Sequence, residues 1–332
     1  MDPLTAPGLL PLALRAGPPP DLTAEPAGFV VSSDDGVRIH FLDWDAGRAA
    51  GTERAPVASR APGLLLLHGL ASTAWSWAAV ARRLGGSASV VAMDLRGHGL
   101  SDSPTAGYEP DLLAADAIAV AEGSGLLALP GEGPAPPFVI AGIGYGAVVA
   151  AWTAHVLGGR CAGLVLVDGG WDHPATAPGA TPEEWLAAIE EPPEVLASMR
   201  AWLADRRGFD PSTWTADEER AARAQVVETA AGRVKLAVHP HALAHAVRAI
   251  WSYQPTAVLP AIEASVAALV ARDDDGTRVA ALAAVGQRRR EAGRSAVRVL
   301  SFSGRGHNLV RHEAGAVAAA LLAVAGGATM RS

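Results

Sequence analysis

The sequence predicts an α/β fold with a mostly parallel, doubly wound sheet of about eight strands and a helical insertion. Short apolar runs of strand length alternate with alanine-rich segments of helical length. This alternation is typical of a parallel sheet covered by helices on both faces. Between residues 172 and 258 only helical stretches occur, and the alternation then resumes. The insertion therefore interrupts a sheet that continues after it.

The first expected elements are two β-rich runs, residues 29–33 and 37–44, separated by the hairpin signal Asp-Asp-Gly. A Gly/Ala/Arg-rich loop follows them. The remaining strands are buried apolar runs expected at residues 64–67, 89–94, 137–141, 163–168, 265–271 and 296–302. Helices are expected at residues 73–84, 112–128 and 146–157 and, near the end of the chain, at 309–325.

The chain is expected to have three parts. Residues 1–27 are a Pro-rich flexible arm, residues 28–171 and 259–332 form the core, and residues 172–258 form the helical insertion. The apolar patch in the arm is broken by Pro11 and preceded by no Lys or Arg, so it makes a poor signal peptide. The single cysteine, Cys161, cannot form an internal disulfide. These features predict a cytoplasmic protein.

Composition and charge limit the classes of partner. Half of the 332 residues are apolar, which is enough for a sizeable core. The formal net charge is -7, with 27 Lys and Arg against 34 Asp and Glu, so no basic excess could neutralise nucleic-acid phosphates or an anionic membrane. No apolar stretch free of charges, Gly and Pro is long enough to span a bilayer. The expected partner is a small molecule, and the oligomeric state is not predicted.

The stretch AGIGYGAVVA, residues 141–150, lies where an expected strand turns into an expected helix. One interpretation is a dinucleotide site of the form G-x-G-x-x-G/A, made by Gly142, Gly144 and Ala147. The other is a nucleophile elbow, G-x-S-x-G, in which Gly144 stands at the position of the attacking serine. The neighbouring loops decide between the two.

Polar, glycine-containing loops follow the expected strands. Ligands of doubly wound sheets bind beyond the carboxyl ends of the strands, so these loops would converge on one edge. The loops begin at His68, Asp94, Gly142, Arg272 and Ser303. The last two supply a carboxylate and then a histidine, in that chain order.

In this order and spacing, these motifs resemble those of the α/β-hydrolase family, AB hydrolase-1 type. The matching features are DGVRIHFLDW, the His-Gly loop, DLRGHGLSD, the glycine stretch, the late aspartates and Gly-His-Asn at residues 306–308. The resemblance covers nearly the whole chain from residue 28 onward, and the helical insertion matches the family's usual lid. It implies a hydrolase-type protein with this fold.

The resemblance also implies a histidine–aspartate pair. His307 would be the general base, and an aspartate would orient its imidazole ring. Asp274 is preferred as this acid because A-R-D-D aligns with a G-x-x-D pattern. Asp273, its neighbour, and Asp168, at the end of the sixth strand, are the alternatives.

Further roles follow from the same resemblance. The backbone N–H groups of Leu70 and Tyr145 would form an oxyanion hole. Trp75 and Trp77, soon after the His-Gly loop, and Ile143 are candidates for the wall of an apolar substrate pocket. Tryptophans of the insertion are further candidates, although packing between its helices is an equally good interpretation.

No metal site and no cofactor are expected. His241 and His245 are four residues apart on one helical face, but the sequence offers no convincing third ligand. Three hydroxyl groups near the expected site, those of Ser72, Ser76 and Ser101, do not lie on the elbow and are poor candidates for a nucleophile. The polar residues Asp94, His98 and Asp102 are expected to organise their own loop rather than to react.

The dinucleotide interpretation has one supporting residue, because Asp168 ends the next strand, roughly where a ribose-binding acid belongs. It leaves the His-Gly loop, DLRGHGLSD and the late aspartate and histidine unexplained. It also places the fingerprint on the third strand of a parallel series rather than on the first. An NAD- or FAD-binding protein is therefore the less favoured alternative.

Gly144 keeps the elbow and removes its reactive atom. The residue at this turn is normally strained, with a positive φ, and glycine avoids the cost. Because glycine has no side chain to acylate, a covalent route through residue 144 is closed. An engineered loss of serine is disfavoured, since Ile143 also departs from the polar residue common in the family.

The favoured function is hydrolase-like chemistry on a small apolar ester or lactone. His307 and Asp274 would activate water or a substrate proton opposite the oxyanion hole. The alternative is a catalytically inactive pseudoenzyme or small-molecule binding module that keeps the fold and the pocket. Retention of both the histidine and an acid favours catalysis over binding alone.

Overall fold

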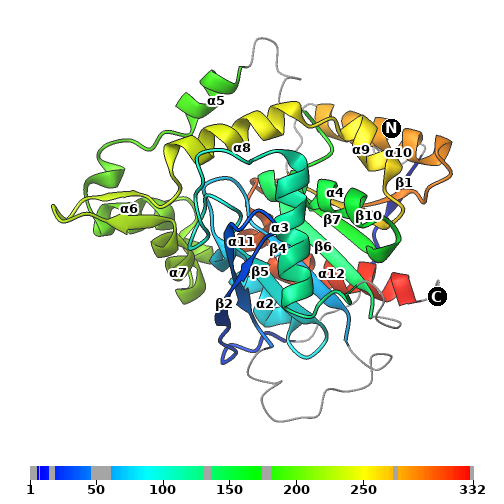
Figure 1. Ribbon diagram of the computed structural model, residues 1–332, viewed down its shortest axis with the longest axis horizontal. Coiled ribbons are helices and arrows are strands. Elements are labelled where there is room, and N and C mark those ends of the chain that lie inside the picture. Colours follow the sequence, from blue (N-terminus) through cyan, green and yellow to red (C-terminus); the bar gives the residue numbers. More distant parts are fainter. Residues whose placement is uncertain are drawn as a thin grey trace.

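The computed structural model describes residues 6, 8–14, 19–45, 61–129, 136–173, 181–271 and 276–329. Their centre is a nine-stranded sheet in the order β1-β11-β10-β7-β6-β4-β5-β3-β2 (Figure 1). Its strands are parallel except for the pairs that β3 forms with β2 and with β5. The strands are β1 (Leu9–Pro11), β2 (Ala27–Ser32), β3 (Arg38–Asp43), β4 (Gly63–Leu67), β5 (Ser89–Met93), β6 (Phe138–Ile143), β7 (Gly163–Val167), β10 (Ser265–Val270) and β11 (Val297–Ser301). The predicted mostly parallel, doubly wound sheet is confirmed.

Helices cover both faces of this sheet, as the uninterrupted apolar strands require. Within β4, Leu65 and Leu67 join one buried cluster, whereas Leu64 and Leu66 join another on the opposite face. The first cluster includes side chains of α3 (Pro110–Gly123), α4 (Tyr145–Leu157), α9 (Pro255–Ala261) and α10 (Thr277–Glu291). The second includes side chains of η3 (Ala74–Trp77), α2 (Ala78–Leu84), α11 (Leu309–His312) and α12 (Ala314–Thr329). None of the helices described is long and apolar enough to cross a membrane.

The insertion lies between β7 and β10 and forms the lobe at the left of Figure 1, with α8 running across the top. Its elements are α5 (Pro182–Ala188), η6 (Val195–Ala197), α6 (Met199–Gly208), η7 (Pro211–Thr213), α7 (Ala216–Ala224), β8 (Val226–Glu228), β9 (Val234–Leu236) and α8 (Pro240–Ser252). The expectation of helices alone is wrong here, because β8 and β9 form an antiparallel hairpin. Val226 and Val234 of this hairpin pack with Trp202 in a small core of their own.

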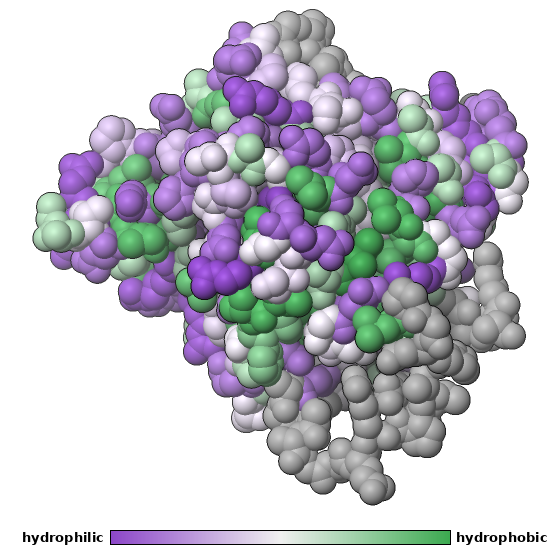
Figure 2. All heavy atoms as spheres, in the orientation of Figure 1, coloured by the Kyte–Doolittle hydropathy of each residue, from purple (hydrophilic) through white to green (hydrophobic). Residues whose placement is uncertain are grey.

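Hydrophobic residues gather on the surface of this lobe in Figure 2. The exposed large apolar side chains of the insertion, as far as the structure describes it, are Trp185, Phe209 and Val227. Because the hairpin and α6 bury few apolar residues between them, part of their apolar surface stays in contact with solvent. The lobe therefore carries apolar side chains at its surface, and two of them, Trp185 and Phe209, also line the cavity described below.

The N-terminal segment differs from the flexible arm that the sequence predicts. Leu9–Pro11 pair in parallel with β11, and the N–H of Leu12 donates to the carbonyl of Val299. Farther along, the side chain of Arg82 on α2 donates to the carbonyl of Leu22. Three apolar residues suffice for this edge strand because β11 already presents a row of unpaired backbone groups.

Candidate active site

A sharp turn joins β6 to α4 at Gly144, where φ is 54° and ψ is -115°. L-residues with a side chain rarely adopt this positive φ, so glycine relieves strain there. The flanking glycines have another role, because a β-carbon at Gly142 would overlap the backbone of Gly146. A β-carbon at Gly146 would overlap the carbonyl groups of Leu67 and His68. These glycines thus allow close packing of β6, α4 and the end of β4.

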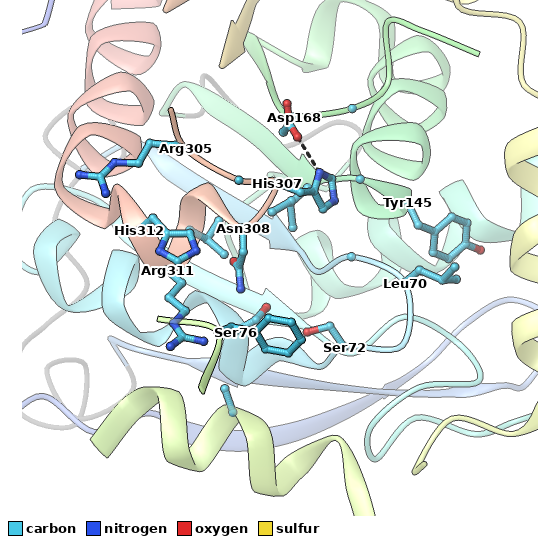
Figure 3. Close-up of a pocket in the computed structure, with 18 of the residues that line it drawn as sticks. Leu70, Ser72, Ser76, Tyr145, Asp168, Arg305, His307, Asn308, Arg311 and His312 are labelled. Atoms are coloured by element: carbon cyan, nitrogen blue, oxygen red, sulfur yellow. Dashed lines mark hydrogen bonds and ion pairs between the residues drawn. The ribbon is translucent and has the colours of Figure 1, made fainter. Parts of the chain in front are cut away.

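His307 faces this turn from the loop between β11 and α11 (Figure 3). Its Nδ1 lies 2.6 Å from Oδ2 of Asp168, which follows β7. Because an ionised carboxylate only accepts, Nδ1–H is the donor, and Nε2 is the ring nitrogen that Asp168 leaves unshared. A β-carbon at Gly144 would lie 3.1 Å from Nε2. The unshared nitrogen is therefore directed at the turn.

Asp168 is held in place by groups other than His307. Its Oδ1 accepts from the backbone N–H of Ala271 at 2.9 Å and from Arg278 at 2.5 Å. Burial opposes ionisation of this carboxyl, but the hydrogen bond from His307 and the charge of Arg278 outweigh it and hold its pKa below its ordinary value. Asp168 is therefore an ionised, oriented acceptor for the imidazole ring.

The sequence placed Asp274 first as the acid, with Asp273 and Asp168 as alternatives. Asp273 and Asp274 lie outside the described residues. Within the described part of the chain, the carboxylate that meets His307 belongs to Asp168.

The His-Gly loop after β4 lies beside the turn. The ring of His68 is fully buried, which lowers its pKa, so it is neutral. Nδ1 donates to the carbonyl of Gly69 at 2.7 Å, and Nε2 accepts from the N–H of Leu95 at 3.0 Å. These two bonds fix the loop that carries Leu70. Neither the N–H of Leu70 nor that of Tyr145 donates to any residue that the structure describes.

A cavity of about 1140 Å³ connects these groups. The core contributes Leu70, Gly144, Tyr145, Asp168 and His307 to its lining, and Ile143 lies in its wall. The insertion contributes Trp185, Phe209, Trp214 and Glu218. The cavity is therefore lined by core and insertion together.

Trp75 and Trp77 are not in the lining of this cavity, and their predicted place in the pocket wall is corrected. Trp77 is fully buried in the core cluster between the sheet and α12. Trp75 packs edge-on against Trp44, with Arg220 over its ring. Both side chains therefore pack on the core cluster and are absent from the cavity lining.

Four arginines line the cavity, and no sequence motif indicates them. Arg278 pairs with Asp168 and Asp172, Arg206 with Glu191, Arg305 with Glu313, and Arg311 with Glu218. The cavity lining therefore combines apolar residues with charged groups that are paired with one another. Only the folded chain brings these arginines together, since they come from α6, α10, the His307 loop and α11.

The other sequence candidates hold the structure around the site. Asp94 accepts from the N–H groups of Ala74 and Leu100 and from His40. Ser101 donates to the carbonyl of Asp94 and takes no part in the cavity lining that the structure describes. The remaining contacts are those of Asp102 with Arg38, of His98 with the carbonyl of Arg96, of His241 with Ser103 and of His245 with the carbonyl of Thr105.

Comparison with known proteins gives one family and several relatives. Residues 64–320 match the family model described as alpha/beta hydrolase family. The chain is 37% identical over 109 residues to epoxide hydrolase 4 of Mus musculus, covering 31% of this chain and 27% of that protein. It is 32% identical over 200 residues to N-formylmaleamate deformylase of Pseudomonas putida, covering 59% and 63%. The chain thus spans less than two thirds of each of these relatives.

Solved structures show the same fold. The structure is similar to E-2-(acetamidomethylene)succinate hydrolase, with a TM-score of 0.63 and 18% identity over 88% of this chain and 96% of that one. It is also similar to the N-formylmaleamic acid deformylase of Pseudomonas putida S16, with a TM-score of 0.62 and 22% identity over 88% and 99%. A thioesterase domain from the curacin biosynthetic pathway gives a TM-score of 0.64 and 19% identity over 90% and 99%.

Proposed function

The chain belongs to the alpha/beta hydrolase family, and from this premise we propose that it hydrolyses a small ester, lactone or related amide without a covalent intermediate. His307 is the general base, Asp168 orients it, and the attacking group is water. The observation that carries this proposal is the position of the two imidazole nitrogens of His307. Nδ1 is bound to a buried carboxylate, and Nε2 faces Gly144.

In the proposed reaction the substrate carbonyl lies over the turn. Its oxygen accepts hydrogen bonds from the N–H groups of Leu70 and Tyr145, which stabilise the developing negative charge. Nε2 of His307 removes a proton as the water oxygen bonds to the carbonyl carbon. Asp168 stabilises the resulting imidazolium.

The tetrahedral intermediate then collapses. The bond to the leaving group breaks, and the imidazolium returns its proton to the departing oxygen or nitrogen. An acid and an alcohol or amine are released, and His307 is neutral again. An acyl-enzyme at residue 144 does not form, because glycine offers no side-chain atom. Residues 172–258 act as the lid that helps to enclose this reaction.

A second candidate, a binding module without turnover, uses the same cavity and differs only in lacking catalysis. Dinucleotide binding has less support. Gly142 and Gly146 are required by contacts with neighbouring backbone, and Asp168 is engaged by His307 and Arg278.

The test is hydrolysis of p-nitrophenyl butyrate, γ-valerolactone and an N-formyl amide by the wild type, His307→Ala and Asp168→Asn. We expect His307→Ala to lower kcat/KM by about a hundredfold or more, which is typical for loss of a general base. Asp168→Asn should also lower it, because the imidazolium loses its counter-charge. Asp172→Asn is the matched control, since Asp172 also pairs with Arg278 but not with His307.

Equal activity in the wild type and His307→Ala would refute the proposal. Folded wild-type protein without activity on any of the three substrate classes would favour the binding module. A Ser72→Ala variant with full activity would exclude the cavity hydroxyl of Ser72 as a replacement nucleophile.

A further inference from the structure

Glu218 of α7 places a carboxyl group in the cavity wall contributed by the insertion. Its side chain is 13% exposed, and the carboxylate accepts no hydrogen bond from the residues that the structure describes. Burial raises the pKa of this carboxyl to about 7. The positive charge of Arg311 opposes this rise, and the negative charge of Asp217 adds to it. Because the carboxyl is incompletely buried, it remains accessible from the cavity.

Arg311 is the charged neighbour of Glu218, but its hydrogen bonds go elsewhere. Its Nε lies 3.6 Å from Oε2 of Glu218, beyond hydrogen-bonding distance. The guanidinium donates instead to Oγ1 of Thr213 at 2.8 Å and to the carbonyl oxygens of Arg206 and Asp210 at 3.1 and 2.7 Å. Arg311 thus supplies charge to Glu218 and leaves its oxygens free to accept from another molecule.

The other charged groups near α7 already have partners. Asp217, on the same helix, binds Arg82 of α2, and Arg206 of α6 binds Glu191. The cations Arg82 and Arg206 are therefore engaged by carboxylates other than that of Glu218.

Ser76 of η3 provides a second unsatisfied group in the same cavity. Its Oγ is buried and has no hydrogen-bond partner among the described residues. The helix α7 packs on η3, and Arg220 of α7 stacks over Trp75, next to Ser76. Figure 3 shows Ser76 on the same side of the cavity as Asn308 and Arg311, away from Tyr145. The cavity lining therefore includes, on two elements that pack together, a carboxyl and a hydroxyl that both lack a hydrogen bond among the described residues.

We propose that Glu218 and Ser76 form a recognition subsite for a neutral hydrogen-bond donor of the substrate, a hydroxyl or amide N–H remote from the scissile carbonyl. The subsite deepens the proposed function, because it takes this cavity as the substrate site. A cationic amine does not fit, since Arg311 lies 3.6 Å from the carboxylate. At pH 8 a carboxylate group does not fit either, because it would meet the charge of ionised Glu218.

The subsite can be tested without turnover, using two ketones that hydrolysis cannot consume. The probes are 4-hydroxy-4-phenylbutan-2-one and 4-phenylbutan-2-one, which differ only in one hydroxyl group. Their affinities are measured by calorimetry at pH 8, where Glu218 is mostly ionised. We expect the wild type to bind the hydroxy ketone about tenfold more tightly, as befits a hydrogen bond to a charged acceptor.

Substitutions then test which residues cause the preference for the hydroxy ketone. Glu218→Gln should reduce it to about threefold, because a neutral amide is a weaker acceptor, and Glu218→Leu should abolish it. Ser76→Ala should reduce it to a lesser degree, and circular dichroism verifies that each variant is folded. Glu219→Gln is the matched control on the same helix, because Glu219 is exposed and pairs with Arg223.

An equal affinity of the wild type for both ketones, or an unchanged preference in folded Glu218→Leu, would overturn the subsite. A protein that hydrolyses no ester but keeps a Glu218-dependent preference would support the subsite while refuting the proposed hydrolysis. The subsite and the proposed hydrolysis can therefore be refuted independently of each other.

Discussion

Nε2 of His307 lies so close to Gly144 that a β-carbon added there would be 3.1 Å from this nitrogen and 3.4 Å from Cε1. The first distance is shorter than a comfortable carbon–nitrogen contact. The imidazole therefore occupies part of the space that a side chain at the turn would enter. With 62% of its side chain exposed, His307 has room to move by the few tenths of an ångström that a larger residue would require.

Gly144→Ser should create a nucleophile at the cost of stability. The positive φ of residue 144 predicts that the variant loses about 1–2 kcal/mol of unfolding free energy. Mixed with p-nitrophenyl acetate, it should release a burst of p-nitrophenol and gain an acetyl group by intact-mass spectrometry. Gly144→Ala should be equally destabilised and remain unmodified. A folded Gly144→Ser protein that is never acetylated would contradict the assignment of this turn as a nucleophile elbow.

Gly146→Ala should disrupt the packing between α4 and β4. The added methyl group would overlap backbone carbonyls of Leu67 and His68, which cannot move aside as a flexible side chain could. We expect a loss of about 3 kcal/mol or more, or failure to fold. Gly306→Ala, beside His307, has open space around it and should change stability by less than about 1 kcal/mol. Urea denaturation of both variants measures the difference, and a stable Gly146→Ala protein would refute this account.

The raised pKa of Glu218 should make stability depend on pH. Between its ordinary value of 4.5 and the folded value of about 7, the folded state keeps a proton that the unfolded state has released. The unfolding free energy should therefore fall by roughly 3 kcal/mol as the pH rises through this window. In Glu218→Gln this contribution should be missing. Denaturation at pH 4.5 and 7.5 tests it, and parallel pH dependence in both proteins would contradict the prediction.

Arg311→Lys should loosen the insertion. Arg311 is almost fully buried and binds Thr213, Arg206 and Asp210 through three nitrogens, whereas lysine has one. We expect a loss of about 1–3 kcal/mol and faster hydrogen exchange in residues 206–213. Arg305→Lys is the control, because Arg305 is half exposed and forms a single ion pair with Glu313. Unchanged exchange in Arg311→Lys would show that the insertion is held by other contacts.

Much of the fold could be predicted because its strands are uninterrupted apolar runs. Residues 64–67 and 163–168 are short apolar runs, which predict strands buried on both faces, and they correspond to β4 and β7. Short elements carry no such signal. The three-residue strands β1, β8 and β9 are defined by their partners rather than by their own composition.

The site was harder to predict than the fold. The Gly-His-Asn motif between the last strand and the last helices indicated His307, and the turn after β6 indicated Gly144. The acid was ambiguous for a geometric reason. Asp168 and Asp274 follow β7 and β10, which are adjacent parallel strands and end at the same edge of the sheet. Sequence order alone does not decide which carboxylate reaches the ring.

The pocket wall depended on how η3 packs. Trp75 and Trp77 follow the His-Gly loop closely, but the short helix η3 turns both of them toward the core. Several groups of the cavity wall come instead from the insertion, whose position depends on contacts such as those of Arg311. No local pattern in the sequence contains that information.

The strand β1 also affects how the protein behaves towards other copies of itself. By pairing with β11, Leu9–Pro11 cover an edge that would otherwise offer free backbone donors and acceptors to another chain. A version of the protein shortened beyond Pro11 would expose that edge beside the apolar residues Val297 and Val299. The sheet thus ends in a three-residue strand that contains Pro11, which is a poorer template for pairing with another chain than β11 would be.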